Sequence, residues 1–332
     1  MNEVCWGMVG CGAVTEKKSG PGLYKSANSR LKAVYDLDYE KACDYARRHG
    51  VPVVARTVEN ILNDPEITAV YLPTPPRFHK EYALRCLGAG KIPYIEKPMA
   101  LRYEECLEVM EAAGKARLPV YVAFYRRGME KYLKIKELID SGALGSIRFV
   151  RLSHFMELEA TDLDRENLPW RLTPSATFGG KFVDMATHVL DVVDFLFGKI
   201  THVQGVADNL GGFYPVEDTL SAVMRCESGV VVSGMWCYVA DHNEEEMLIV
   251  GEKGHIRTTG LFYGPVRVTV QGREELLDFP EPEHVAQPYI QRIVNEMTGA
   301  VPSGADMQSA ANNVKIVDDL LREYRQRYPE WR

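Results

Sequence analysis

The sequence has no long apolar run, no paired-cysteine motif and no extended cluster of one charge. No stretch approaches the roughly 20 apolar residues that span a bilayer, and the first residues lack the basic and apolar regions of a secretion signal. The 7 cysteines are scattered without a CxxC pair, which argues against a zinc site and favours reduced thiols. Lys and Arg number 39 against 46 Asp and Glu, so no broad basic surface is expected. We therefore expect a soluble cytoplasmic protein with no metal, membrane or nucleic-acid partner.

The length and composition are those of an ordinary folded protein. The chain has 332 residues, of which 46% are hydrophobic and 26% charged. At roughly 150 residues per domain, this length favours two domains with sizeable cores.

Short apolar runs alternate with amphipathic stretches over residues 1–123. The predicted strands are Val4–Val9, Leu31–Tyr35, Thr68–Leu72, Ile92–Ile95 and Val120–Ala123. The predicted helices between them are Asp38–Arg48, Val58–Leu62, Phe78–Leu87 and Arg102–Ala116. This alternation predicts an α/β domain of the Rossmann type, a doubly wound parallel sheet covered on both faces.

The pattern changes in residues 124–332. One helix is predicted from Met129 to Ile139, and two more, Pro288–Thr298 and Asp306–Tyr324, close the chain. The predicted strands are Ile147–Phe155, Val203–Asp208, Thr219–Cys226, Val230–Tyr238, Met247–Val250, His255–Thr258, Val266–Val270 and Glu275–Phe279. Neighbouring strands joined by tight turns predict an α+β domain with a large, mostly antiparallel sheet. Both faces of the strand around Val231–Tyr238 carry apolar groups, so we expect the chain to form a homodimer or homotetramer through this sheet. We also expect this domain to bind the substrate.

A glycine turn follows the first predicted strand. Gly10 and Gly12 match the first two glycines of G-x-G-x-x-G, and Thr15 stands where the third is expected. In that motif the turn lets the backbone approach a pyrophosphate at a helix N-terminus. We expect Gly10, Gly12, Ala13 and Val14 to contact a dinucleotide.

Asp36 ends the second predicted strand. A carboxylate at this place accepts hydrogen bonds from the adenosine ribose and repels a 2′-phosphate. Asp36 lies 26 positions after Gly10, and the segment from Lys17 to Arg30 supplies the extra length. The sequence therefore favours NAD, while Lys17 and Lys18 leave NADP open.

Two further segments leave the carboxyl ends of predicted parallel strands, where ligands bind in open α/β sheets. Thr74-Pro75-Pro76 follows one strand, with His79 at the start of the next helix, and Glu96-Lys97-Pro98 follows another. We expect Thr74, Pro75, His79, Glu96 and Lys97 to lie at the cofactor. Lys97 is also a candidate for holding a substrate hydroxyl.

These motifs resemble the glucose–fructose oxidoreductase/inositol dehydrogenase/MocA (Gfo/Idh/MocA) family. The resemblance continues through the second half of the chain, in order. It rests there on Phe124-Tyr125-Arg126-Arg127, Trp170-Arg171, Gly179-Gly180-Lys181-Phe182-Val183-Asp184, His188 and Asp191. It implies an NAD(P)-dependent enzyme that transfers a hydride between the nicotinamide and a secondary alcohol or ketone of a sugar, cyclitol or related polyol.

The resemblance also implies roles for individual residues. Lys97, Asp184 and His188 take the places of the family's catalytic residues, and Arg126 joins them as a substrate-binding residue. Trp170 and Arg171 match a pair that touches the nicotinamide end in some relatives. Two departures bear on substrate and cofactor: Lys181 interrupts a frequent triple glycine, and Tyr125 replaces a frequent Asn.

The residue types suit this chemistry. Asp184 and His188 are four apart on a predicted helix and share a face. An imidazole, with an unperturbed pKa of about 6.5, can take the hydroxyl proton as hydride leaves carbon. The ammonium of Lys97 can stabilise the developing alkoxide, and Asp184 can orient the substrate. Without the resemblance, a helical histidine beside Val189 and Leu190 is more often a core residue.

Two alternatives keep the same fold. One is glycoside cleavage, in which a tightly held NAD oxidises the sugar transiently and elimination follows. The other is a non-catalytic dinucleotide-binding protein, because a fold alone does not establish activity.

Overall fold

The computed structural model describes residues 2–174, 178–261 and 263–328, which form two compact units. The first unit comprises residues 1–129 and 282–311, and the second comprises residues 130–281 and 312–332. The chain thus returns to the first unit after the second sheet. The predicted domain division near residue 123 stays a prediction.

The first unit is built on a six-stranded parallel sheet in the order β3-β2-β1-β4-β5-β6. Its strands are β1 (Val4–Val9), β2 (Ser29–Tyr35), β3 (Val53–Val54), β4 (Ala69–Leu72), β5 (Ile92–Ile95) and β6 (Tyr121–Val122). Every residue of β1 is buried, as expected for a central parallel strand covered on both faces. The predicted Rossmann-type sheet is confirmed.

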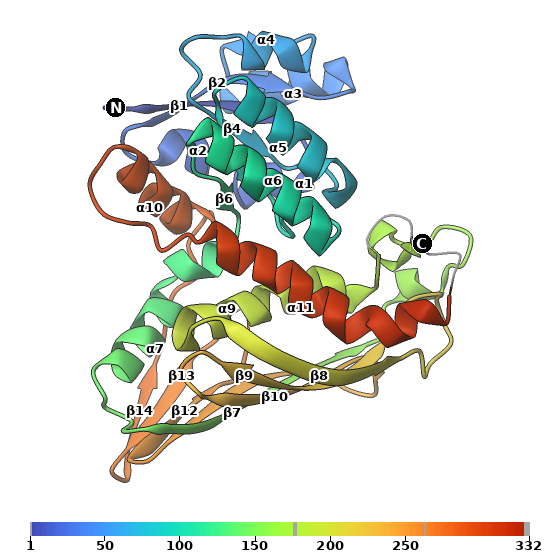
Figure 1. Cartoon of the computed structure of the whole chain (residues 1–332), viewed down its shortest axis with the longest axis vertical. Helices are drawn as coiled ribbons and strands as arrows, with labels where there is room; N and C mark the ends of the chain where they lie inside the picture. Colours follow the sequence, from blue (N-terminus) through green and yellow to red (C-terminus); the bar gives the residue numbers. More distant parts are fainter. Residues whose placement is uncertain (1, 175–177, 262, 329–332) are drawn as a thin grey trace. The chain divides into compact units, whose positions relative to one another are not determined.

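The helices of this unit lie between consecutive strands (Figure 1). They are α1 (Ala13–Lys17), α2 (Gly22–Lys25), α3 (Tyr39–His49), α4 (Val58–Leu62), α5 (His79–Gly88) and α6 (Tyr103–Ala116), with the 3-10 turns η1 (Pro76–Phe78) and η2 (Tyr125–Gly128). From the far end of the chain, α10 (Gln287–Met297) adds Tyr289, Ile290 and Ile293 to the same core. The short helix α2 lies inside the segment from Lys17 to Arg30, where the sequence predicts only a loop.

The second unit is built on an eight-stranded sheet in the order β14-β13-β12-β11-β7-β10-β9-β8. Its strands are β7 (Ile147–Glu157), β8 (Ile200–Asp208), β9 (Thr219–Cys226), β10 (Val231–Ala240), β11 (Glu244–Gly251), β12 (Gly254–Thr258), β13 (Val266–Val270) and β14 (Arg273–Leu277). Only the pair of β7 and β10 is parallel. The predicted large, mostly antiparallel sheet is therefore confirmed.

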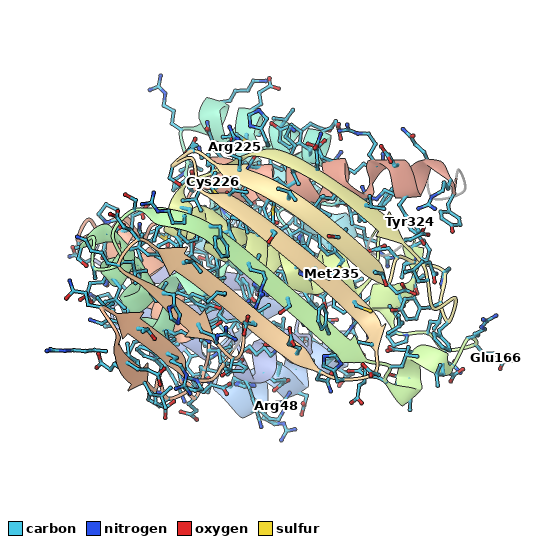
Figure 2. The ribbon with its side chains drawn as sticks, turned by 90° about the horizontal axis from the view of Figure 1, so that it is seen from below. Arg48, Glu166, Arg225, Cys226, Met235 and Tyr324 are labelled. Atoms are coloured by element: carbon cyan, nitrogen blue, oxygen red, sulfur yellow. The ribbon has the colours of Figure 1, made fainter. Side chains whose placement is uncertain are left out.

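One face of this sheet is covered by helices (Figure 1). The helical segments of the unit are α7 (Glu130–Asp140), η3 (Ala160–Leu163), η4 (Trp170–Leu172), the π-helix η5 (Phe182–Ala186), α9 (Thr187–Phe197) and α11 (Met307–Gln326), which begins in the first unit. Along β9, Leu220, Ala222 and Met224 are buried while Val223 is 54% exposed. Figure 2 looks onto the opposite face, where Met235 lies and over which the described part of the second unit places no helix.

Candidate active site

The glycine turn leaves β1 and is shaped for close backbone approach. Gly10 has φ +116° and donates its amide to the Tyr35 carbonyl at 2.7 Å. A side chain there would be strained and would meet the Pro73 backbone at 3.4 Å. Apart from the adjoining residues, the described part of the chain places no atom within 4 Å of the position that a Cβ of Gly12 would take. The turn therefore presents open space at the start of α1, with Ala13 and Val14 as that helix's first residues.

The carboxylate of Asp36 lies against this turn. Its Oδ2 accepts the Cys11 amide at 2.8 Å, and its Oδ1 accepts the Asp38 amide at 3.0 Å. Lys41 places its Nζ 3.3 Å from Oδ2, and the Asp36 side chain is 14% exposed. Burial, with a smaller contribution from Asp36, raises the pKa of the Cys11 thiol to about 12. The thiol stays neutral, and the acidic group at the turn is Asp36.

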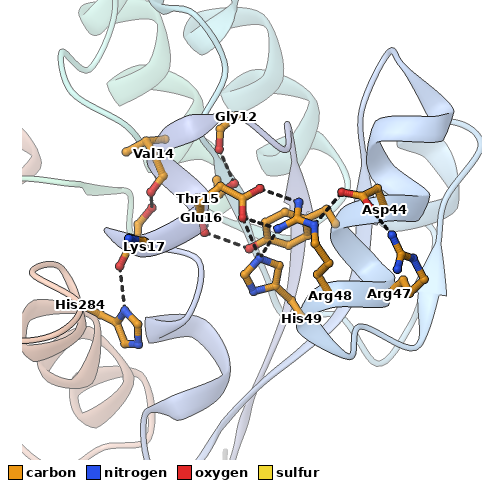
Figure 3. A network of polar contacts seen from close by, with 12 residues as sticks. Gly12, Val14, Thr15, Glu16, Lys17, Asp44, Arg47, Arg48, His49 and His284 are labelled. Atoms are coloured by element: carbon orange, nitrogen blue, oxygen red, sulfur yellow. Dashed lines mark hydrogen bonds and ion pairs between the residues drawn. The ribbon is translucent and has the colours of Figure 1, made fainter.

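Helix α1 is held in place from two sides (Figure 3). On one side Glu16 accepts hydrogen bonds from Arg48 at 2.6 Å and lies 3.0 Å from the His49 ring. These contacts, the Arg48 bond foremost, lower the pKa of Glu16 to about 2. On the other side the Lys17 carbonyl lies 2.8 Å from Nδ1 of His284. A helix of 5 residues has little stability of its own, so these contacts fix the turn it follows.

His79 joins the two segments that leave β4 and β5. Its ring nitrogens lie 2.7 Å from the carbonyl oxygens of Pro98 and Thr74. Complete burial lowers its pKa to about 4, against the opposing effect of the two carbonyls. His79 therefore links Thr74, beside Pro75, to the Glu96-Lys97-Pro98 segment.

The half-buried Glu96 belongs to a hydrogen-bonded group with the buried Tyr71 and Ser19 at the end of β5. Its Oε1 lies 2.5 Å from the Tyr71 hydroxyl, which in turn lies 2.6 Å from the Ser19 hydroxyl. Its Oε2 accepts the amide of Lys97 at 3.2 Å. Desolvation raises the pKa of Glu96. The group connects the segment carrying Lys97 with the turn after α1.

Arg126 is the last predicted site residue in the first unit. It lies in η2 and is 1% exposed, with its guanidinium 4.9 Å from the centre of the Tyr125 ring. The first unit thus carries all the predicted cofactor residues except Trp170 and Arg171.

The second unit carries Asp184 and His188 where the π-helix η5 passes into α9. π-helical turns occur often at functional sites. Asp184 Oδ2 lies 4.0 Å from Nε of Arg171, and the Asp184 side chain is 21% exposed. His188 is 8% exposed, and Trp170, next to Arg171, is 51% exposed. The structure therefore brings Asp184 and Arg171 together and places His188 one turn beyond Asp184.

Lys181 makes a buried ion pair that the sequence does not indicate. Its Nζ lies 2.5 Å from Oδ2 of Asp162, and both side chains are 0% exposed. This pair ties η3 to the start of η5. A lysine at this place therefore serves the packing of the loop that precedes Asp184.

A cavity of about 370 Å³ lies elsewhere in the second unit, and none of the predicted site residues lines it. Its walls are Arg165, Leu168, Gly212, Phe213, Tyr214 and Pro215. Among the described residues, no group of three or more His, Cys, Asp and Glu side chains is arranged to hold a metal ion. Nor does any described helix combine the length and apolar character needed to cross a membrane.

Three residues near the predicted site escaped the sequence analysis. Among the described residues, the cation paired with Asp36 is Lys41, whereas the sequence drew attention to Lys17 and Lys18. Asp162 in η3 and Glu217 in a loop are buried acids, and each contacts the segment that precedes Asp184. Lys41 was open to prediction, because Asp38 caps the helix that carries it. Asp162 and Glu217 lie in segments without a periodic apolar pattern.

A parallel sheet, a glycine turn and a carboxylate at the end of the second strand are the features of a dinucleotide-binding domain. Residues 4–124 match the family model described as "Oxidoreductase family, NAD-binding Rossmann fold", and residues 132–257 match the "GFO/IDH/MocA C-terminal domain". The chain belongs to the Gfo/Idh/MocA family. It is an oxidoreductase, and its cofactor is NAD.

Relatives cover the whole chain. It is 34% identical over 319 residues to Oxidoreductase P35 of Formosa agariphila, covering 96% of this chain and 98% of that protein. It is 22% identical to trans-1,2-dihydrobenzene-1,2-diol dehydrogenase of Xenopus tropicalis, covering 98% and 99%. Among solved structures, levoglucosan dehydrogenase in complex with NADH and levoglucosan has a TM-score of 0.82 at 22% identity, covering 98% of each chain. This last likeness shows the fold.

The residues at the turn fit NAD. Gly12 leaves space for a pyrophosphate at the start of α1, and Gly10 permits the positive φ of the turn. Asp36 offers carboxylate oxygens at the end of β2, the usual place of the ribose-binding acid.

Proposed function

We propose that this oxidoreductase transfers a hydride between NAD and a secondary alcohol or ketone of a sugar, cyclitol or related polyol. Relatives acting on diols and sugars support a CH–OH dehydrogenase or reductase. The observation that carries the proposal is the set of ionisable groups at Lys97, Asp184 and His188. Lys97 lies just after the carboxyl end of the parallel strand β5. Asp184 and His188 share the helical segment in which η5 passes into α9.

Each group has a defined task in the oxidation. His188 takes the proton of the reacting hydroxyl as the carbon becomes a ketone. Lys97 stabilises the negative charge that develops on that oxygen. When bound, NAD supplies the acceptor for the hydride. In the reverse direction the imidazolium of His188 returns the proton to the carbonyl oxygen.

Asp184 orients the substrate through a neighbouring hydroxyl. Its carboxylate lies 4.0 Å from Arg171, and hydrogen bonds from hydroxyls to a charged carboxylate are stronger than those to neutral groups. Trp170, Arg171 and Arg126 are proposed to line the nicotinamide and substrate region. The remaining cofactor contacts are proposed for the glycine turn, Asp36, Thr74, Pro75, His79 and Glu96.

A panel of polyols, aldoses, anhydro-sugars and cyclitols tests the proposal, with NADH absorbance as the readout. Lys97→Met and His188→Gln should each lower kcat by more than about a hundredfold while NAD still binds, since general acid–base catalysis contributes roughly that much. His202→Gln, an exposed change on β8, is the control. Full activity in either variant overturns the assigned roles.

We also propose that the uncovered face of the large sheet joins copies of the chain. Val206 is 71% exposed, Val223 54% and Met235 36%, and exposed apolar side chains on an uncovered sheet face favour association. Light scattering should show a dimer or tetramer, and Val223→Asp should shift it toward monomer. A monomer at micromolar concentration overturns this part of the proposal.

A further inference from the structure

Glu217 is a buried acid in the loop between β8 and β9. It is 1% exposed, and its Oε1 accepts the backbone amide of Gly180 at 2.6 Å. No hydrogen bond to its Oε2 occurs within the described residues. A carboxyl group placed so deeply costs free energy unless it serves a structural or chemical purpose.

The Gly179-Gly180 pair packs directly against Glu217. A Cβ at Gly180 would lie 2.7 Å from the Glu217 carbonyl oxygen, and a Cβ at Gly179 would lie 3.1 Å from Oε1. Larger residues at these two positions would push the segment away. The glycines and the acid therefore fit one another as a unit, which gives the glycine pair a specific task.

Gly180 connects this acid to Asp184. Its amide donates to Glu217, while its carbonyl accepts the Asp184 amide at 3.4 Å. A single residue thus joins Glu217 to the first turn of η5. The buried pair of Lys181 and Asp162 holds the next residue of the same turn.

We propose that Glu217 is a positioning residue for Asp184, acting through the two backbone hydrogen bonds of Gly180. The inference rests on the proposed function, in which Asp184 orients the substrate. Without the acceptor at Glu217, the Gly180 amide is buried and unpaired, and the turn shifts to satisfy it. Asp184 then moves from the position in which it meets the substrate, so substrate affinity falls.

The electrostatic surroundings of Glu217 leave its hydrogen bond intact at any pH near neutrality. Burial raises its pKa from 4.5 to about 7, while Arg325 on α11 opposes this and Asp218 adds to it. Tyr214, Tyr238 and Tyr324 face it as well. Both the protonated and the ionised carboxyl can accept the Gly180 amide. The positioning role therefore needs an acceptor oxygen and not a charge.

Three variants test this role. Glu217→Leu removes the acceptor, Glu217→Gln restores an uncharged one, and Glu217→Asp withdraws the acceptor by one methylene. The matched control is Glu227→Leu, because Glu227 accepts the Lys199 amide at 3.2 Å just beyond the other end of α9. In Glu217→Leu we expect KM for the polyol to rise roughly tenfold or more. A tenfold rise corresponds to a loss of about 1.4 kcal/mol in the free energy of substrate binding. kcat should change less, and NAD affinity should not change.

Amide hydrogen exchange of the peptide spanning residues 178–188 gives a second readout that needs no substrate. Exchange at Gly180 and Asp184 should be faster in Glu217→Leu and Glu217→Asp and close to that of the unmodified protein in Glu217→Gln and Glu227→Leu. Unchanged exchange and KM in Glu217→Leu, or no rescue by Gln, overturns the proposal. If Glu217→Leu does not fold, the comparison of Glu217→Asp with Glu217→Gln decides it. An unmodified protein inactive on every polyol overturns the proposed function, whereas the exchange data still decide whether Glu217 fixes this turn.

Discussion

The Asp36 carboxylate accepts the Cys11 amide at 2.8 Å and thereby joins the end of β2 to the glycine turn. The same side chain is 14% exposed, so part of the carboxylate stays open while the turn orients it. In the proposed function this open part meets the ribose hydroxyls. A carboxylate already held in place by the turn would lower the cost of binding.

Cofactor preference follows from this geometry. We predict that the protein uses NAD with at least roughly tenfold higher kcat/KM than NADP, because a 2′-phosphate would lie beside a carboxylate. Asp36→Ser should shift the preference toward NADP. Asp38→Ser is the control, since it removes a neighbouring carboxylate and keeps a residue that caps α3. Equal use of both cofactors by the unmodified protein would show that Asp36 does not meet the ribose.

Lys41 should weaken the preference for NAD over NADP. Its ammonium lies 3.3 Å from Asp36 and offsets part of the repulsion felt by a phosphate. We expect Lys41→Met to lower kcat/KM for NADP by several-fold and to change the value for NAD less. Comparison of the two kcat/KM ratios measures this effect. A larger loss with NAD than with NADP would contradict it and would assign Lys41 to the support of Asp36 itself.

The buried pair of Lys181 and Asp162 should matter for stability. Removing one partner of a buried ion pair leaves an uncompensated charge, which costs about 3–5 kcal/mol. We therefore expect Lys181→Met to lower the free energy of unfolding by that order, as measured by urea denaturation. The double variant with Asp162→Leu should recover part of the loss. Lys315→Met, which breaks an exposed pair with Asp319, should cost less than about 1 kcal/mol.

Glu217 should make the stability of the folded protein depend on pH. Its pKa is raised from 4.5 in the unfolded chain to about 7 in the folded protein. The folded state therefore binds the Glu217 proton more tightly than the unfolded chain does. The stabilisation that this proton gives the folded state is complete below about pH 4.5 and is lost as pH rises through about 7. Glu217→Gln removes the dependence. Its Tm should exceed that of the unmodified protein by more than about 2 °C above pH 8 and match it below pH 4.5. Parallel Tm curves for the two proteins across this range would contradict the assignment.

The parts of the fold that the sequence predicts well are those with periodic apolar patterns. The strand Val4–Val9 and the helix Val58–Leu62 have the predicted bounds, because apolar spacing and caps act locally. The two-residue strand β3 was not predicted, since its pairing with β2 depends on a neighbour outside the segment. The packing of α10 in the first unit likewise depends on residues far from it in the sequence.

Some residues of the candidate site could likewise be predicted from the sequence and others could not. Gly10, Gly12 and Asp36 follow predicted strands, so their place at one edge of a sheet could be predicted. Glu217 could not, because its contact with Gly180 joins residues 37 positions apart through a loop without a regular pattern. The tasks of Lys97, Asp184 and His188 come from the family resemblance and stay predictions.

In the proposed reaction, hydride passes from a substrate carbon bearing a hydroxyl to NAD. The most direct measurement uses a polyol that is active in the panel and carries deuterium at the reacting carbon, with the enzyme and NAD in equal amounts. Mass spectrometry of the nicotinamide should find the deuterium in the reduced cofactor, with the ketone formed in matching amount. Cleaved glycoside without reduced cofactor, or deuterium released to water, would contradict the claim.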